Sequence, residues 1–181
     1  ASPVFCDIDP NHWNINLNQL GAHYTSKTKA ILPVHFAGQP VNLDALYNWA
    51  EQHKVIVIED ACHALGASFN GKPIGHCKDM AVFSFHPVKS ITTGEGGMVT
   101  TPHEWMYQKL LQFRSHGLLR NSQQFTALTP DPWVYEMQTL GYNYRLTDFQ
   151  AAMGSAQLRK LDGFIKARDQ LAMRYRHAFE Q

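Results

Sequence analysis

Polar side chains that could take part in chemistry follow strand-like apolar runs at three places in the chain. Asp60 and His63 come just after the run Val-Ile-Val-Ile, and Ser84 and Lys89 stand at and beyond the end of the next apolar run. The third place is the glycine-rich segment 93–97 (Thr-Gly-Glu-Gly-Gly). Because parallel sheets bind ligands beyond the carboxyl ends of their strands, this clustering indicates a candidate site.

Each of these residues also has an ordinary structural interpretation. Asp60 can cap a helical turn that starts at Ala61, and a single histidine such as His63 is commonly structural. His63 shares a face with Asp60 if this segment is helical. Most lysines are surface charges, whereas the catalytic alternative for Lys89 is a Schiff-base lysine that reacts as a neutral amine. Residue types alone leave both interpretations open.

Two other kinds of site fit the sequence poorly. Segment 93–97 lacks the Gly-Lys-Ser/Thr ending of a phosphate loop, and the chain has no GxGxxG motif, which argues against a dinucleotide site. Its glycines fit a tight turn before a strand. The pairs Cys62-His63 and His76-Cys77 offer four ligands for zinc. Neighbouring side chains on a strand or helix point apart, however, so this spacing disfavours a metal site.

The composition predicts a single globular domain. The 181 residues are 44% hydrophobic and 17% charged, and the net charge of +1 gives no electrostatic reason to expect nucleic acid or a membrane surface as a partner. We expect neither a membrane span nor a leader, because no apolar run approaches ~20 residues. Three cysteines without a CxxC pair favour a cytoplasmic location. The chain starts without Met, so we expect it to be part of something longer.

The elements that must position these residues alternate between strands and helices. The β-branched run 55–58 predicts a parallel strand covered on both faces. Asn70-Gly71 predicts a hairpin turn, and 115–139 is expected to be irregular. The strands expected are 4–8, 30–36, 55–58, 80–85 and 97–101, and the helices are 43–53, 104–114 and one long helix from Thr147 onward. This alternation predicts an α/β fold with a mostly parallel sheet.

Three motifs, in this order, resemble the DegT/DnrJ/EryC1/StrS family of sugar aminotransferases, which depend on pyridoxal phosphate (PLP). They are 59–67 (EDACHALGA), 83–89 (FSFHPVK) with 93–97, and 141–152 (GYNYRLTDFQAA). The sequences FSFHPVK (83–89) and YEMQTLGYNYRLTD (135–148) are most similar to the branch of the family that makes the 4-amino sugar precursor of pseudaminic acid. The resemblance implies the large domain of a fold type I PLP-dependent transferase, with three α/β/α layers and a mostly parallel sheet.

By the same resemblance, residues 1–181 form a partial large domain that is truncated at both ends. The upstream segment that cradles the cofactor phosphate and supplies a ring-stacking residue in full-length members is expected to be absent. The helix from about 147 is expected to lead towards a smaller carboxyl-terminal domain that is absent as well.

The resemblance implies a role for each polar residue of the first two motifs. Asp60 would pair with the pyridine nitrogen of PLP and keep it protonated, and His63 would lie near the ring hydroxyl. Ser84 would donate its hydroxyl to the PLP phosphate. Lys89 would carry the cofactor covalently and then act as the base and acid of the proton transfer.

The third motif adds two residues. Asn143 would reach the cofactor phosphate of the neighbouring subunit, which implies a homodimer with shared sites. Arg145 would contact the nucleotide sugar.

The implied reaction has two halves. Glutamate gives its amino group to PLP and leaves as 2-oxoglutarate, and the amino group then passes to the C4 keto group of a nucleotide-linked 4-keto-6-deoxy sugar. One alternative is a PLP-dependent sugar dehydratase of the same family, which Lys89 disfavours because those enzymes have His at its position. A catalytically silent structural or regulatory domain is a second alternative. A nicotinamide-dependent enzyme is a third, disfavoured by the missing dinucleotide motif.

Overall fold

A computed structural model describes residues 1–119, 125 and 133–180. The chain divides into two compact units. The first contains residues 1–102 and 148–181, and the second contains residues 103–147.

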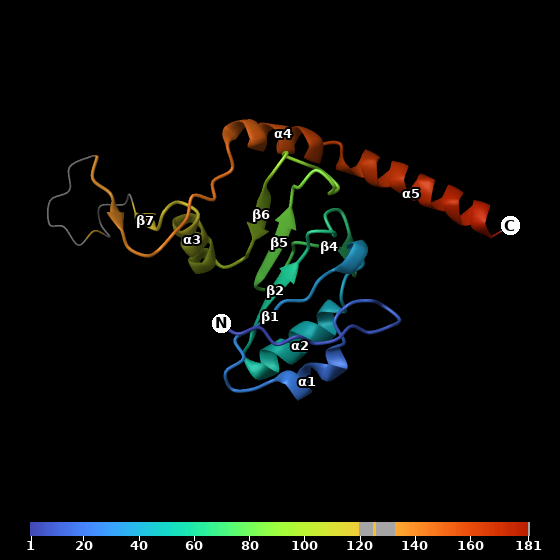
Figure 1. The fold of residues 1–181 in the computed structure, drawn as a ribbon, viewed down its shortest axis with the longest axis horizontal. Coiled ribbons are helices and arrows are strands. Elements are labelled where there is room, and N and C mark those ends of the chain that lie inside the picture. The colour runs from blue at the N-terminus through green and yellow to red at the C-terminus, as the bar shows by residue number, and fades with distance from the viewer. Residues whose placement is uncertain (120–124, 126–132, 181) are drawn as a thin grey trace. The chain divides into compact units, whose positions relative to one another are not determined.

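The first unit is built on a four-stranded sheet in the order β1-β2-β5-β6 (Figure 1). Strands β1 (Ala30–Ile31), β2 (Ile56–Asp60) and β5 (Met80–Ser84) are parallel to one another. Strand β6 (Gly97–Thr100) runs antiparallel to β5. The predicted α/β class with a mostly parallel sheet is therefore confirmed.

One face of this sheet carries the hydrophobic core. Side chains alternate along a strand, so Val57 of β2 and Phe83 of β5 both point to this face. Helix α2 (Leu43–His53) packs against β1 and β2 there through Leu46 and its neighbours. Leu161, at the start of helix α5 (Leu161–Phe179), packs near Phe83. The predicted helix 43–53 is confirmed, and Asn42 caps it by accepting the Ala45 N–H.

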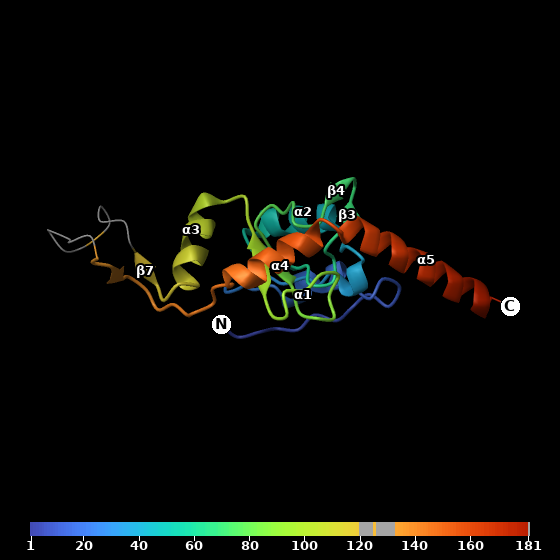
Figure 2. The same cartoon turned by 90° about the horizontal axis from the view of Figure 1, so that it is seen from above.

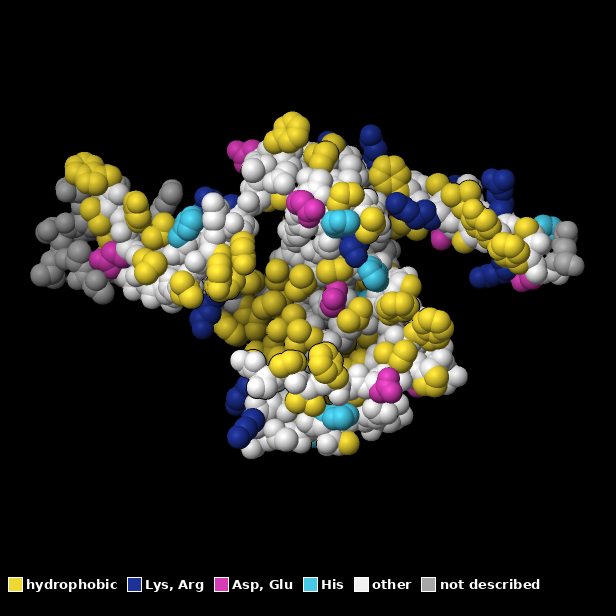
Figure 3. Space-filling view, in the orientation of Figure 1, with side chains coloured by type: hydrophobic (Ala, Val, Ile, Leu, Met, Phe, Trp, Pro, Cys, Tyr) yellow, Lys and Arg dark blue, Asp and Glu magenta, His cyan; other side chains and the backbone are white. Residues whose placement is uncertain are grey.

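The opposite face of the sheet is apolar and exposed. Leu32, Val34, Ile56 and Val99 are between 36% and 63% exposed, and Figure 3 shows hydrophobic side chains gathered over the strands. The expectation that 55–58 is covered on both faces is therefore wrong for this chain, since the described helices α2 and α5 pack on the other face.

The long helix predicted from Thr147 is divided in two. Helix α4 spans Asp148–Leu158, and α5 begins at Leu161 after a turn in which the Lys160 N–H donates to the Gln157 carbonyl. The turn allows Leu161 to be buried in the core. Figures 1 and 2 show α4 lying across the end of the sheet at which β2 and β5 finish.

The predicted strand 4–8 is wrong, because only Ile8 pairs, in an isolated bridge with Ile15. Strand 30–36 is shortened to β1 plus a bridge between Val34 and Asp60. The short helical turns are η1 (Leu17–Gln19), α1 (Leu20–His23) and η2 (Phe36–Gly38).

The predicted hairpin turn is confirmed. Strands β3 (Ser68–Phe69) and β4 (Lys72–Pro73) pair antiparallel around Asn70 and Gly71. Both turn residues have positive φ angles, 49° and 77°, as a type I′ turn requires.

The second unit contains helix α3 (Glu104–Phe113), close to the predicted helix 104–114. Segment 115–139, expected to be irregular, includes the short antiparallel pair β7 (Leu118–Leu119) and β8 (Glu136–Met137), and much of the rest lies outside the described residues. No helix in the described part of the chain is long and apolar enough to cross a membrane.

Candidate active site

Asp60 and Ser84 lie on the same face and at the same edge of the sheet. Asp60 is the last residue of β2 and pairs in register with Val82 of the neighbouring parallel strand β5. Ser84 ends β5 two residues further on, so its side chain projects to the same face as those of Val82 and Asp60. This is the exposed face of the sheet, and this edge is the one predicted from the sequence.

Backbone and side-chain hydrogen bonds hold Asp60 in place. Its N–H donates to the Pro33 carbonyl over 2.8 Å, and its carbonyl accepts the His35 N–H over 3.0 Å. Its Oδ1 atom accepts the N–H of Cys62 over 3.0 Å. Asp60 therefore caps a turn, as the structural interpretation expected, but the residues after it form turns and no helix.

His63 lies within these turns, so the expected helical face shared with Asp60 is not formed. Its side chain is exposed, and its ring lies edge-on to Phe36 with 6.2 Å between ring centroids. Gly38 comes so close to the His63 carbonyl that a Cβ atom there would lie 3.0 Å from the oxygen. The segment after β1 therefore supports the backbone of His63.

Lys89 lies in a turn that begins at Ser84. The Ser84 Oγ atom accepts the His86 N–H over 3.3 Å, and the Lys89 N–H donates to the His86 carbonyl over 3.0 Å. Lys89 is half-buried, in contrast to the exposed Val88 before it. The turn thus brings Lys89 to the same edge of the sheet as Ser84.

Asp60 and Lys89 both affect the pKa of the Cys62 thiol. Burial raises the pKa of Cys62 to about 11, and the hydrogen bond and negative charge of Asp60 raise it as well, while the positive charge of Lys89 acts in the opposite direction. The charges of both groups therefore act on the same thiol. Asp60, Ser84 and the turn that contains Lys89 therefore lie at the same end of the sheet, and their roles toward a cofactor stay predictions.

Segment 93–97 forms the tight turn before β6 that its glycines predicted. The Thr93 N–H and the Thr92 Oγ1 hydroxyl both donate to the Phe85 carbonyl, over 3.0 Å and 2.9 Å. Gly94 has a φ of 79°, which favours glycine. These bonds join the two ends of the loop that contains Lys89.

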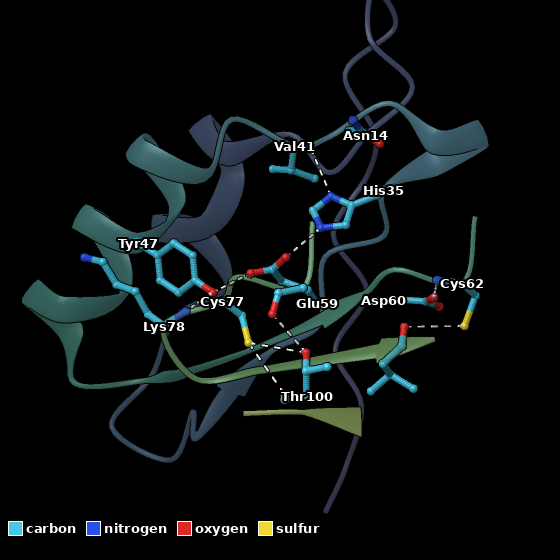
Figure 4. A network of polar contacts seen from close by, with 12 residues as sticks. Asn14, His35, Val41, Tyr47, Glu59, Asp60, Cys62, Cys77, Lys78 and Thr100 are labelled. Carbon is cyan, nitrogen blue, oxygen red and sulfur yellow. Dashed lines mark hydrogen bonds and ion pairs between the residues drawn. The ribbon is translucent and has the colours of Figure 1, made fainter. Parts of the chain in front are cut away.

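A buried polar network lies behind Asp60, on the core side of β2 (Figure 4). Glu59 is 1% exposed, and its two oxygens accept from His35 Nε2 over 2.9 Å and from the Tyr47 hydroxyl over 2.5 Å. His35 Nδ1 accepts the Val41 N–H, which leaves Nε2 as the donor to Glu59. Burial, followed by the hydrogen bond to Glu59, raises the pKa of Tyr47 and keeps its hydroxyl protonated.

Sequence reasoning missed this network. The available signal was the position of Glu59, which alternation places on the same face as the buried Val57. A carboxylate there must have donors nearby. His35 and Tyr47, 24 and 12 residues away, gave no local signal.

The cysteine and histidine pairs considered for zinc do not form a ligand cluster. Among the described residues, no group of three or more His, Cys, Asp or Glu side chains could hold a metal ion. Cys77 instead bonds to the carbonyl of Thr100 over 3.5 Å.

Asn143 and Arg145 belong to the second unit. Asn143 forms an antiparallel bridge with Ser115, and both Asn143 and Arg145 have exposed side chains. Tyr142 and Tyr144 are the residues before and after Asn143, and their rings stack on each other with centroids 4.9 Å apart. The third motif is thus an ordered segment with two polar side chains available for contacts.

Residues 1–181 match the DegT/DnrJ/EryC1/StrS aminotransferase family over their whole length. The chain belongs to this family. The resemblance inferred from the three motifs is thereby confirmed, and so is the fold type I class. Aminotransferases of the family use PLP.

Relatives with assigned names include the spore coat polysaccharide biosynthesis protein SpsC of Bacillus subtilis, which is 40% identical over 100% of this chain and 46% of its own length. The chain therefore spans about half the length of this relative. The structure of Helicobacter pylori PseC, an aminotransferase of pseudaminic acid biosynthesis, has a TM-score of 0.89 and 34% identity over 99% of this chain and 46% of its own.

Two further structures bear on the chemistry. A putative sugar aminotransferase from Streptococcus pneumoniae in its PMP form has a TM-score of 0.86 and 30% identity over 99% of this chain and 50% of its own. A GDP-4-keto-6-deoxymannose-3-dehydratase has a TM-score of 0.82 and 36% identity over 98% of this chain and 47% of its own. Structural similarity and sequence identity therefore do not distinguish an aminotransferase from a dehydratase for this chain.

Proposed function

We propose that the protein is a PLP-dependent aminotransferase that moves an amino group from glutamate to the C4 keto group of a nucleotide-linked 4-keto-6-deoxy sugar of the pseudaminic acid type. The observation that carries the proposal is the placement of Asp60, Ser84 and Lys89 at one edge of the parallel sheet. The similarity to PseC supports the substrate class. The proposal concerns the whole protein, because the chain spans about half the length of its relatives.

The residues at this edge fit the three polar parts of the cofactor. Asp60 uses Oδ1 for the Cys62 N–H, and its second oxygen can accept a hydrogen bond from a protonated pyridine nitrogen. Ser84 Oγ accepts from His86, so its hydroxyl proton can be donated to a phosphate oxygen. Lys89 supplies the primary amine that condenses with an aldehyde.

Bound PLP would supply an electron-withdrawing ring and an aldehyde that takes up the amino group. Asp60 would keep the pyridine nitrogen protonated through a charged hydrogen bond. Ser84 would hold the phosphate, and His63 would lie near the ring hydroxyl. Lys89 Nζ would be the base and acid that moves the proton.

The third motif completes the proposal. Asn143 binds the cofactor phosphate of the partner subunit, so the protein is a homodimer with shared sites, and Arg145 contacts the nucleotide sugar. We place the enzyme in the cytoplasm, where its cysteines Cys6, Cys62 and Cys77, which are free, stay reduced.

Reductive trapping tests the assignment of Lys89. The protein is incubated with PLP, reduced with borohydride and digested, and the modified lysine is located by mass spectrometry. We expect the PLP mass on Lys89 and its loss in Lys89→Arg, which keeps the charge but cannot condense with the aldehyde. Lys78→Arg, at an exposed ion pair with Glu51, is the matched control and should be trapped like the wild type. Labelling spread over several lysines and unchanged by Lys89→Arg would refute the proposal.

A sugar dehydratase is the second candidate, favoured by the similarity to the 3-dehydratase structure. The two activities differ in their products, since an aminotransferase forms a 4-amino sugar while a dehydratase removes a sugar hydroxyl and leaves a keto sugar. Incubation with glutamate and UDP- or dTDP-linked 4-keto sugars, followed by mass spectrometry, separates them. We expect nitrogen from labelled glutamate in the sugar, and a deoxy keto sugar would instead support the dehydratase. Trapping at Lys89 without either product would support a silent domain.

A further inference from the structure

One face of helix α4 contacts the loop that carries Lys89. Gln150, Gly154 and Gln157 are spaced by four and three residues, so they lie on the same side of the helix. Gln150 Nε2 donates to the Glu95 carbonyl over 3.0 Å. Gln157 Oε1 accepts the N–H of Thr92 over 3.1 Å. The helix is therefore bonded to the loop backbone at two points.

Gly154 lies between these two glutamines in sequence and fits against Thr93. A Cβ atom at Gly154 would lie 2.8 Å from the Thr93 Cγ2 methyl, closer than packed carbon atoms approach one another. Thr93 is 2% exposed, and its Oγ1 hydroxyl donates to the Glu95 carbonyl over 2.7 Å. The threonine is therefore held in one position, and the helix can approach it only because residue 154 has no side chain.

The same threonine closes the loop. Its N–H donates to the Phe85 carbonyl, next to Ser84, and the hydroxyl of Thr92 donates to the same oxygen. Residues 86–91, which include Lys89, are enclosed by these bonds. A displacement of Thr93 is thus passed directly to the base of the lysine loop.

We propose that α4 is a positioning element for Lys89, and that Gly154 and Thr93 form a fitted pair which sets the position of the lysine loop. Residues Gln150, Gly154 and Gln157 touch neither substrate nor cofactor in this proposal and act through the loop. The consequence for Lys89 reactivity rests on the proposed function, whereas the contact between helix and loop does not.

Amide hydrogen exchange tests the contact without any cofactor. Gly154→Ala overpacks the site, and we expect about tenfold faster exchange of the amides of Thr93 and Gly94. Thr93→Ser removes the Cγ2 methyl and keeps the hydroxyl, so the double variant Gly154→Ala/Thr93→Ser should recover slow exchange. Gly163→Ala is the matched control, because a Cβ atom there would meet none of the described atoms within 4 Å. Unchanged exchange in Gly154→Ala, or no recovery in the double variant, would overturn the proposal.

A second variant covers the case in which Gly154→Ala does not fold. Gln157→Met keeps a long side chain and removes the acceptor for the Thr92 N–H. We expect faster exchange at Thr92 with little change in the exchange of β2. Uniformly faster exchange across the sheet would mean that α4 supports the whole fold and not the loop, which would contradict the proposal.

The rate of reductive trapping at Lys89 measures the effect on the lysine. We expect Gly154→Ala to slow the trapping about tenfold and Gly154→Ala/Thr93→Ser to restore it, with Gly163→Ala unchanged. If the exchange results hold but wild-type Lys89 is not trapped, the proposed function fails while the helix–loop contact stands. If wild-type Lys89 is trapped and Gly154→Ala is trapped equally fast, α4 does not position the lysine.

Discussion

The Cys62 thiol is a natural reporter of the candidate site, because the charges of both Asp60 and Lys89 affect its pKa. Burial makes the largest contribution, and Asp60 adds to it by hydrogen bonding and by charge repulsion with a thiolate. Any change in the carboxylate of Asp60 should therefore be readable at this sulfur atom.

Alkylation of Cys62 should be slow at neutral pH and rise steeply in alkali. With a pKa of about 11, only about one thiol in a hundred is a thiolate at pH 9, whereas a thiol of pKa 9.0 is half ionised there. The rate with iodoacetamide should increase about tenfold per pH unit up to about pH 11. Peptide mass spectrometry distinguishes Cys62 from Cys6 and Cys77. A rate that levels off near pH 9 would contradict the raised pKa.

Asp60→Asn should make Cys62 more reactive. The amide keeps an acceptor for the Cys62 N–H but carries no negative charge, so the pKa of the thiol falls and alkylation at pH 9 becomes faster. Asp44→Asn is the control, since Asp44 is exposed and bonds to Asn70. Equal rates in Asp60→Asn and the wild type would place the carboxylate too far from Cys62 to matter.

At the scale of the elements, β2 carries two acidic residues whose side chains lie on opposite faces of the sheet. Asp60 faces the site, and Glu59 faces the core, where it bonds to His35. The backbone of His35 in turn donates to the Asp60 carbonyl. The buried network therefore connects the segment after β1 to β2 at the residue that would pair with the pyridine nitrogen in the proposed function.

Glu59→Gln should destabilise the fold by about 1–3 kcal/mol, because one of the two acceptors then becomes a donor facing His35 or Tyr47, both of which also donate. Urea unfolding followed by circular dichroism measures the loss. Glu51→Gln makes the same chemical change at an exposed ion pair with Lys78 and should cost between 0 and about 1 kcal/mol. Losses of equal size at the two positions would mean that the Glu59 network contributes no more than a surface contact.

Local patterns were sufficient to predict the elements that the site stands on. The β-branched run predicted β2, the next apolar run predicted β5, and Asn70-Gly71 predicted its turn, because each depends on neighbouring residues. The run at 4–8 looked the same locally but forms only the Ile8 bridge, since a strand also needs a partner.

Contacts between distant residues could not be predicted in this way. Asp60, Ser84 and Lys89 could be proposed as site residues because the carboxyl ends of parallel strands meet at one end of the sheet and because the motifs resemble a family. The bond between His35 and Glu59 and the fit of Gly154 against Thr93 join residues 24 and 61 positions apart. Only the packed structure shows which position has no room for a side chain and which carboxylate is buried.

At the scale of the whole molecule, the proposed site needs two chains. Asp60, Ser84 and Lys89 come from one unit of a chain, while Asn143 is proposed to bind the cofactor phosphate in the partner subunit. A closed dimer of this kind has two equivalent sites, each with Lys89 from one chain and Asn143 from the other. Lys89 and Asn143 can then be substituted in separate chains, and the two kinds of chain can be combined in one dimer.

Lys89→Arg and Asn143→Ala chains, co-expressed with different affinity tags and purified as a mixed dimer, should regain activity. One site of the mixed dimer lacks both residues, and the other has both, so amino transfer from glutamate should reach about half of the wild-type rate. Each homodimer alone should be much less active, because both of its sites are defective. A mixed dimer of Lys89→Arg with wild type also keeps one complete site, so its rate of amino transfer shows what one complete site per dimer yields. If Lys89 and Asn143 of the same chain formed each site, the mixed dimer would contain no complete site and would be no more active than the Asn143→Ala homodimer.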